Sequence, residues 1–163
     1  MRFITIAAII AAATLVAGCD QHPSRTVKLK GKDGSVTISG NNEHMTVKSD
    51  NGKTTVEINA NGLGNQKLPD FAPTYPGAQV KVSVASPTEG GGTFAFETSD
   101  APDKVIAFYK NKAASAGLAE KLNMNANGAL TYMAGAGDDK KTLQVIAAKS
   151  DAGTHVQVFW AAK

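Results

Sequence analysis

The chain of 163 residues is poor in the residues that usually carry chemistry. It contains a single cysteine, Cys19, and three histidines. One cysteine excludes a disulfide framework within the chain. The apolar stretch from Ile4 to Val16 would rise only about 20 Å as a helix, which is short of a hydrocarbon core of roughly 30 Å. We therefore expect no permanent membrane-spanning helix.

Neither sign of charge dominates the sequence. Seventeen Lys and Arg residues stand against 14 Asp and Glu residues, a formal net charge of +3. The lysines are interspersed with nearly as many acids, whereas nucleic-acid binding is typical of clustered Lys and Arg with interleaved aromatic residues. A nucleic-acid partner is therefore not expected.

The beginning of the chain has the three parts of a secretory signal. Arg2 supplies the basic start, the apolar stretch follows, and the small residues Ala17 and Gly18 precede Cys19. The run Val16-Ala17-Gly18-Cys19 resembles the lipobox of bacterial lipoproteins. An ordinary signal followed by a chance cysteine, or an inert buried cysteine, is the alternative.

The lipobox resemblance implies a lipid anchor on Cys19. It implies cleavage of the Gly18–Cys19 bond, a diacylglyceryl thioether on the Cys19 sulfur and, in many bacteria, an acyl chain such as palmitate on the Cys19 nitrogen. One acyl chain holds a protein at a membrane only marginally, whereas two or three hold it firmly. With Cys19 acylated, no thiol remains for a thiolate metal site or for nucleophilic catalysis.

The residue after the anchor bears on the compartment. Asp20, followed by Gln21, resembles the sorting signal that keeps proteobacterial lipoproteins in the inner membrane, facing the periplasm. This expectation holds for a Gram-negative host, with the outer membrane as the alternative. A solvated linker residue is the other interpretation of Asp20.

The sequence predicts five segments: a signal peptide over 1–18, a tether over 19–26, a twin β-hairpin module over 27–59, a Gly/Pro linker over 60–77 and an α+β domain over 78–163. The linker is rich in Gly, Asn and Pro, and Leu68, Phe71 and Tyr75 are expected to hold it against a surface. Whether the two β regions share one core is left open by the pattern.

The twin β-hairpin module is predicted from alternation around two turns. Asp33-Gly34 and Asn51-Gly52 are typical of two-residue hairpin turns, because both turn positions require φ > 0. One face is apolar and comprises Val27, Leu29, Val36, Ile38, Met45, Val47, Val56 and Ile58. Fewer than about 40 residues rarely bury enough surface to fold alone. We therefore expect this face to be covered by the downstream domain, a second copy or a partner.

Further alternation predicts strands at 78–86, 93–99, 129–134, 142–148 and 154–160, with a short one at 120–124. In the first, Val80, Val82 and Val84 should share one face, opposite Lys81 and Ser83.

Spacings of three and four predict one helix from Ala101 to Gly117, capped by Ser99 or Asp100. The predicted fold class is therefore α+β: an N-terminal antiparallel β-meander of two hairpins, followed by a mostly antiparallel sheet with one packed helix.

The motifs that could carry chemistry are weak. Glu89–Gly92 lacks the lysine and hydroxyl of a phosphate-binding loop, and Asp138-Asp139 lacks the spaced ligands of a calcium loop. Both are predicted to be turns. The histidines His22, His44 and His155 have no partner at metal-ligand spacing. The sequence therefore predicts no catalytic, cofactor or metal site.

Two functions remain open. The first is a membrane-anchored envelope lipoprotein that acts as a non-catalytic binding or structural module for an envelope protein, cell-wall material or lipid. It would bind through a sheet face or through the loop Pro73–Pro76. The alternative is a small envelope hydrolase or carrier whose site forms only in the fold. The runs "YPGA" from Tyr75 and "VIAFY" from Val105 resemble those of small uncharacterised proteobacterial lipoproteins and imply no activity.

Overall fold

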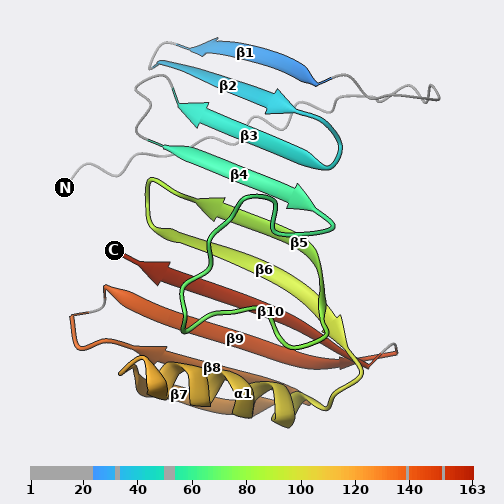
Figure 1. The fold of residues 1–163 in the computed structure, drawn as a ribbon, viewed down its shortest axis with the longest axis vertical. Helices are drawn as coiled ribbons and strands as arrows, with labels where there is room; N and C mark the ends of the chain where they lie inside the picture. The colour runs from blue at the N-terminus through green and yellow to red at the C-terminus, as the bar shows by residue number, and fades with distance from the viewer. Residues whose placement is uncertain (1–23, 32–33, 50–53, 139, 152) are drawn as a thin grey trace.

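The computed structural model describes residues 24–31, 34–49, 54–138, 140–151 and 153–163. They form one antiparallel ten-stranded sheet and one α-helix (Figure 1). In chain order the elements are β1 (Arg25–Gly31), β2 (Gly34–Gly40), β3 (His44–Ser49), β4 (Thr55–Ala60), β5 (Gln79–Ser86), β6 (Gly91–Thr98), α1 (Pro102–Ser115), β7 (Ala119–Ala126), β8 (Ala129–Gly135), β9 (Lys141–Ser150) and β10 (Gly153–Ala162).

The order of strands in the sheet is β1-β2-β3-β4-β5-β6-β10-β9-β8-β7. A mostly antiparallel sheet with one helix confirms the predicted α+β class. Asp33, Asn51 and Gly52, which belong to the two predicted hairpin turns, lie outside the described residues. β4 pairs with β5 and places Ile58 opposite Val84, so the first four strands and the later six share one sheet. The division into separate domains stays a prediction.

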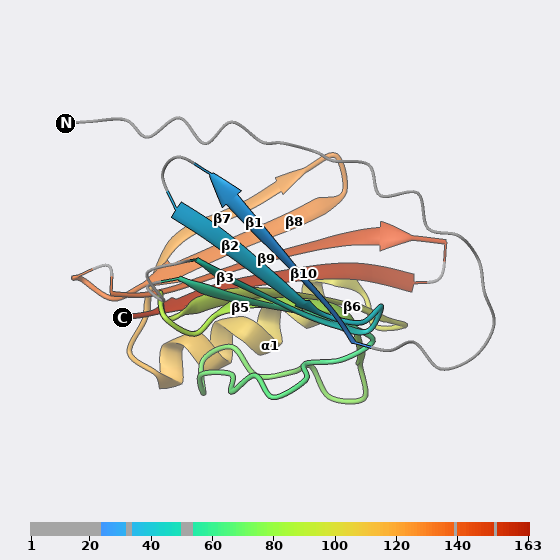
Figure 2. The same ribbon diagram turned by 90° about the horizontal axis from the view of Figure 1, so that it is seen from above.

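One face of the sheet carries the hydrophobic core. Seen from above in Figure 2, α1 and the segment 61–78 lie on the same side of the sheet. Phe71 and Tyr75 of this segment are buried, and the Tyr75 ring stacks on Phe96 of β6 with centroids 5.8 Å apart. The segment therefore is irregular and fixed to a surface, as the sequence predicts. The core also includes Phe94, Tyr132, Leu143, Val145, Val156 and Val158.

The helix forms where the apolar spacing predicts it. Val105, Ile106, Tyr109 and Ala113 are buried along one stripe, and α1 packs on β8 and β9. The predicted capping by Ser99 or Asp100 is wrong. The N-cap residue is Ala101, whose methyl side chain cannot accept a capping hydrogen bond.

The Asp100 carboxylate is used elsewhere, which explains why it does not cap the helix. It accepts hydrogen bonds from the Tyr75 hydroxyl at 2.6 Å and from Lys104 Nζ at 2.8 Å. The Asp100 backbone carbonyl accepts a third from the Thr154 hydroxyl at 2.7 Å. Asp100 thus joins the start of α1 to the segment 61–78 and to β10.

The alternation predicted for β5 holds for Val82 and Val84, which share a face opposite Ser83, and is wrong for Val80, because a β-bulge intervenes. The register shifts between Val80 and Val82, and an inserted residue reverses which side chains face the core. Ser83 is fully buried, whereas Val82 is 41% exposed. The bulge therefore turns Val82 away from the core and onto the opposite face of the sheet.

Candidate functional site

The second face of the sheet is the most distinctive surface of the molecule. In the ranges that the structure describes, no element packs against it, because α1 contacts only one side of β7, β8 and β9 and the segment 61–78 lies on that same side. We call this second face the open face. The large apolar side chains that the described residues leave exposed are Val27, Leu29, Val36, Val82, Leu122, Met124 and Phe159.

Strand register places all seven of these side chains on the open face, because residues paired across neighbouring strands point to the same side. Val27 pairs with Ile38, Ile38 with Val47, and Val47 with Val56. Ile58 then pairs with Val84 of β5, two positions from Val82.

The same relation extends through the second half of the sheet. Phe159 pairs with Thr93 of β6, which itself pairs with Val84. At the far edge Leu122 and Met124 pair with Met133 and Thr131, which alternate with the buried Tyr132. The exposed apolar residues therefore belong to one surface.

The composition of the open face changes along the sheet. Across β1 to β4 the open face carries the eight apolar residues that the sequence predicts to share a face. Among the described residues of these four strands, Arg25 at the start of β1 is the only charged residue on this face. Across β6 and β10 it carries Glu97, His155 and Gln157. The first half of the open face is therefore apolar, and the second half is mixed.

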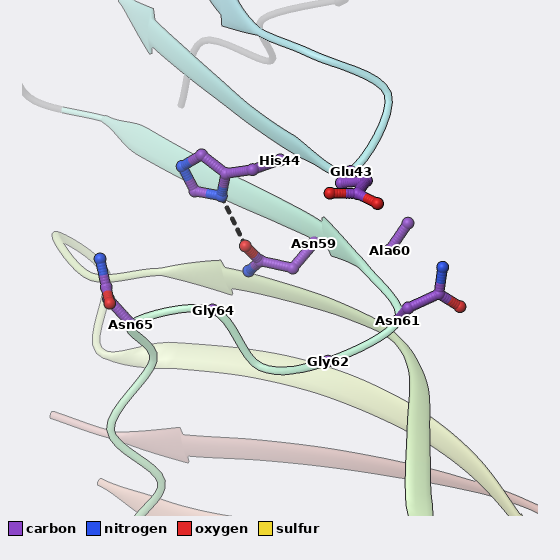
Figure 3. Close-up of a pocket in the computed structure, with 8 residues that line it drawn as sticks. All are labelled: Glu43, His44, Asn59, Ala60, Asn61, Gly62, Gly64 and Asn65. Atoms are coloured by element: carbon purple, nitrogen blue, oxygen red, sulfur yellow. Dashed lines mark hydrogen bonds between the residues drawn. The ribbon is translucent and has the colours of Figure 1, made fainter. Parts of the chain in front are cut away.

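A polar cluster lies at the edge of the opposite face, beside a cavity of about 270 Å³ (Figure 3). His44 Nδ1 and Asn59 Oδ1 are 2.5 Å apart, and His44 Nε2 lies 3.4 Å from the Thr46 hydroxyl. Asn59 Nδ2 donates to Leu63 O at 3.2 Å and to the Ser83 hydroxyl at 3.4 Å.

The cluster serves to hold a turn. The Ser83 hydroxyl donates to Gly62 O at 2.7 Å. A Cβ on Gly64, which has φ +57°, would collide with the Asn59 amide. Both ring nitrogens of His44 contact neighbouring side chains, and the partners are an amide and a hydroxyl. The geometry therefore explains how the chain leaves β4.

The loop Pro73–Pro76, predicted as a possible binding surface, is held by its tyrosine. Tyr75 is buried and donates to Asp100, while Tyr109 OH donates to Pro73 O at 3.0 Å. Burial, and then the hydrogen bond to Asp100, raise the pKa of Tyr75 to about 12. Burial likewise raises the pKa of Tyr109. Hydrogen bonds from Lys104 and then from Tyr75 lower the pKa of Asp100. The Tyr75 side chain is therefore committed to the core and is not available to a ligand.

The sequence-predicted anchor residues cannot be placed. Gly18, Cys19, Asp20 and Gln21 lie outside the described residues, as does His22. Lipidation, cleavage and sorting therefore stay predictions.

The turn predicted for Glu89–Gly92 is confirmed for Glu89 and Gly90 and is wrong for the two glycines that follow. Glu89 lies in the turn between β5 and β6, and Gly91 and Gly92 begin β6. Asp138 accepts a hydrogen bond from the Lys140 amide at 3.2 Å and forms an ion pair with Lys140 Nζ at 3.3 Å, while Asp139 lies outside the described residues. Within the described ranges, no three His, Cys, Asp or Glu residues are grouped so that they could hold a metal ion.

His155 has a carboxylate neighbour that spacing in the sequence does not reveal. The register places it directly opposite Glu97 on the open face. Both belong to strands in the middle of the sheet, and neither lines the cavity beside His44. The pair is therefore a cross-strand contact on an open surface.

A family model described as START domain-like matches residues 78–154, somewhat less than half of the chain. The matched region runs from just before β5 to the second residue of β10 and includes α1. No curated protein and no solved structure matches the chain significantly. In the described part of the chain, no helix has the length and hydropathy that a membrane span requires.

Sequence reasoning missed the second half of the open face. Phe159 lies between the buried Val158 and the partly buried Trp160 in "THVQVFW", and Leu122 and Met124 alternate with Lys121 and Asn123. These alternations are visible in the sequence. They do not show that the residues share one surface, which follows only from the topology that places β10 and β7 in the same sheet as β1 to β5.

Proposed function

We propose that this protein is a membrane-anchored envelope lipoprotein that acts as a non-catalytic binding or structural module through the open face. The observation that carries the proposal is that all exposed large apolar side chains of the described residues lie on one face of the sheet. Exposed apolar side chains gathered on one face are typical of an interaction site, whereas singly scattered ones are not. The twin β-hairpin module, residues 27–59, supplies its apolar half.

The anchor in this proposal is the acylated Cys19, supported by the lipobox resemblance of Val16–Cys19. Asp20 and Gln21 favour the inner membrane, facing the periplasm, in a Gram-negative host, with the outer membrane as the alternative. The proposed partners are therefore the membrane, through the anchor, and envelope protein, cell-wall or lipid material, through the open face.

A carrier of an apolar ligand is the second candidate. The START domain-like match over residues 78–154 favours it, since such a match suggests ligand binding. A hydrolase is less well supported, because His155 and Glu97 face each other on an open sheet surface. Native mass spectrometry of the purified chain distinguishes the candidates: a carrier retains a stoichiometric apolar small molecule, whereas a docking module is recovered without one.

The anchor is tested by the mass of the mature N-terminus. We expect the wild-type chain to begin at Cys19 and to carry diacylglyceryl and acyl mass. A Cys19→Ser variant should remain uncleaved at this bond and unacylated, with Ser24→Ala, in the predicted tether, as a control that is processed normally. Recovery of a wild-type N-terminus without added acyl mass would refute the anchor.

A further inference from the structure

The strand nearest the predicted anchor combines an exposed apolar face with positive charge. Val27 is 50% exposed and Leu29 is 56% exposed on the open face of β1, the highest values among the large apolar residues of the described chain. β1 is also an edge strand of the sheet. Successive residues of a strand point to opposite faces, so Lys28 does not lie on the open face between Val27 and Leu29.

The sequence around β1 is basic. Arg25, Lys28, Lys30 and Lys32 fall within eight residues, and Asp20 is the only acid between Cys19 and Lys32. Arg25 lies on the open face at the start of β1. A basic segment beside a lipid anchor is attracted to anionic phospholipid, because the headgroups carry the opposite charge. One acyl signal plus a basic segment also holds a protein to a membrane more firmly than either does alone.

The length of chain before β1 limits where this strand can lie. Arg25 follows Cys19 by six positions, and six residues span at most about 20 Å when fully extended. An anchor in the membrane therefore keeps β1 within reach of the headgroups. The apolar side chains of β1 and β2 are then the nearest uncovered apolar surface to the bilayer.

We infer that the open face at β1 and β2 docks onto an anionic phospholipid surface, with Val27, Leu29 and Val36 entering the interface and Arg25 contacting headgroups. This inference rests on the proposed function, because the anchor is what holds β1 at the membrane. It assigns the β1–β2 end of the open face to lipid and leaves the mixed half, around Glu97 and His155, exposed to the aqueous side.

Tryptophan substitutions in the full chain test this orientation independently of the cysteine. Leu29→Trp reports on the open face of β1, and Thr26→Trp, on the same strand and the opposite face, is the matched control. The wild-type chain gives the background, since its one tryptophan, Trp160, packs against the core. Each chain is measured in vesicles of phosphatidylcholine with phosphatidylglycerol, using acyl chains brominated to quench tryptophan, and in vesicles of phosphatidylcholine alone.

We expect Leu29→Trp to lose most of its additional emission in the mixed vesicles and much less in phosphatidylcholine alone, while Thr26→Trp stays at background in both. Equal quenching of the two variants would overturn the inference. So would a blue-shifted Leu29→Trp emission that depends on protein concentration and not on vesicles, since that result would assign the face to a second copy. A soluble partner as occupant would leave Leu29→Trp unquenched and would likewise overturn it.

The mass of the Cys19 peptide, measured on the same samples, separates this inference from the anchor. Acylated Cys19 with unquenched Leu29→Trp would refute the docking and keep the anchor. Unacylated Cys19 with selective quenching of Leu29→Trp would refute the anchor and support the docking surface.

Discussion

At the scale of single residues, Asp20 tests the sorting proposal. A carboxylate directly after the anchor should retain the protein in the inner membrane of a Gram-negative host. We expect Asp20→Ser to move a substantial share of the protein to the outer membrane in density-gradient fractionation. His22→Ser, two positions further on, is the control and should leave the distribution unchanged. If Asp20→Ser fractionates like the wild type, Asp20 has no sorting role.

Tyr75 governs a second residue-scale prediction, on alkaline stability. Its pKa is raised to about 12 in the folded chain, whereas an unfolded tyrosine titrates near 10. Between these values the unfolded chain binds fewer protons than the folded chain, so the free energy of unfolding falls as pH rises from 10 to about 12. Below pH 10 the contribution of Tyr75 to the free energy of unfolding is fully present.

Tyr75→Phe should therefore lessen the alkaline loss of stability without removing it, because Tyr109 titrates in the same direction. At neutral pH the variant should lose about 1.5–3 kcal/mol, the worth of a hydrogen bond to a charged group, because Tyr75 donates to the Asp100 carboxylate. Tyr132→Phe is the control at pH 7, since within the described residues the Tyr132 hydroxyl makes no hydrogen bond. Burial, and then the charge of Glu120, also raise the pKa of Tyr132, so this variant too should lessen the alkaline loss while leaving stability at pH 7 nearly unchanged. Chemical denaturation at pH 7 and at pH 11 measures both effects, and an identical pH dependence for wild type and Tyr75→Phe would contradict the assignment.

At the scale of elements, the open face predicts an asymmetry between two valines. Val36 and Val158 both lie in strands, but Val36 is partly exposed on the open face and Val158 is fully buried under the helix side. Val36→Asp should change the free energy of unfolding by about 1 kcal/mol or less, within the range of strand propensity. Val158→Asp buries an unpaired charge and should cost roughly 4 kcal/mol or more.

Thermal melts of the two variants measure this asymmetry, with Thr37→Asp on the opposite face of β2 as a second exposed control. A melting temperature for Val36→Asp that falls as far as that of Val158→Asp would mean that the open face is covered within the molecule. That outcome would support the sequence-based expectation that the downstream part of the chain covers the apolar face of residues 27–58.

Local patterns predicted most elements, because alternation and helical spacing act over a few neighbours. The helix stripe from Val105 to Ala113 and the buried Phe71 and Tyr75 follow from the sequence. The bulge after Val80 did not, since one inserted residue reverses a face without changing the composition. The cap at Ala101 was missed because Asp100 binds Tyr75 and Lys104, which are contacts that depend on the tertiary fold.

At the scale of the whole molecule, one continuous sheet explains why the functional surface could not be predicted. The open face extends across the whole sheet, from edge strand β1 to edge strand β7. The pairing of β4 with β5 joins the first four strands to β5 and β6, and the pairing of β6 with β10 joins these to the last four strands. The sequence indicated an apolar face for residues 27–58 and gave no means of extending it. The candidate site is thus a property of topology, whereas each of its strands is a property of local sequence.

The pairing of β6 with β10 also determines the order in which the sheet can form. Every other pair of neighbours in the sheet is consecutive along the chain, whereas this one joins Gly91–Thr98 to Gly153–Ala162 across the helix and three strands. Closing so large a loop is slow relative to forming a hairpin. The two groups of strands can therefore assemble early and separately, and the sheet becomes whole only when β10, the last strand in chain order, inserts at its centre.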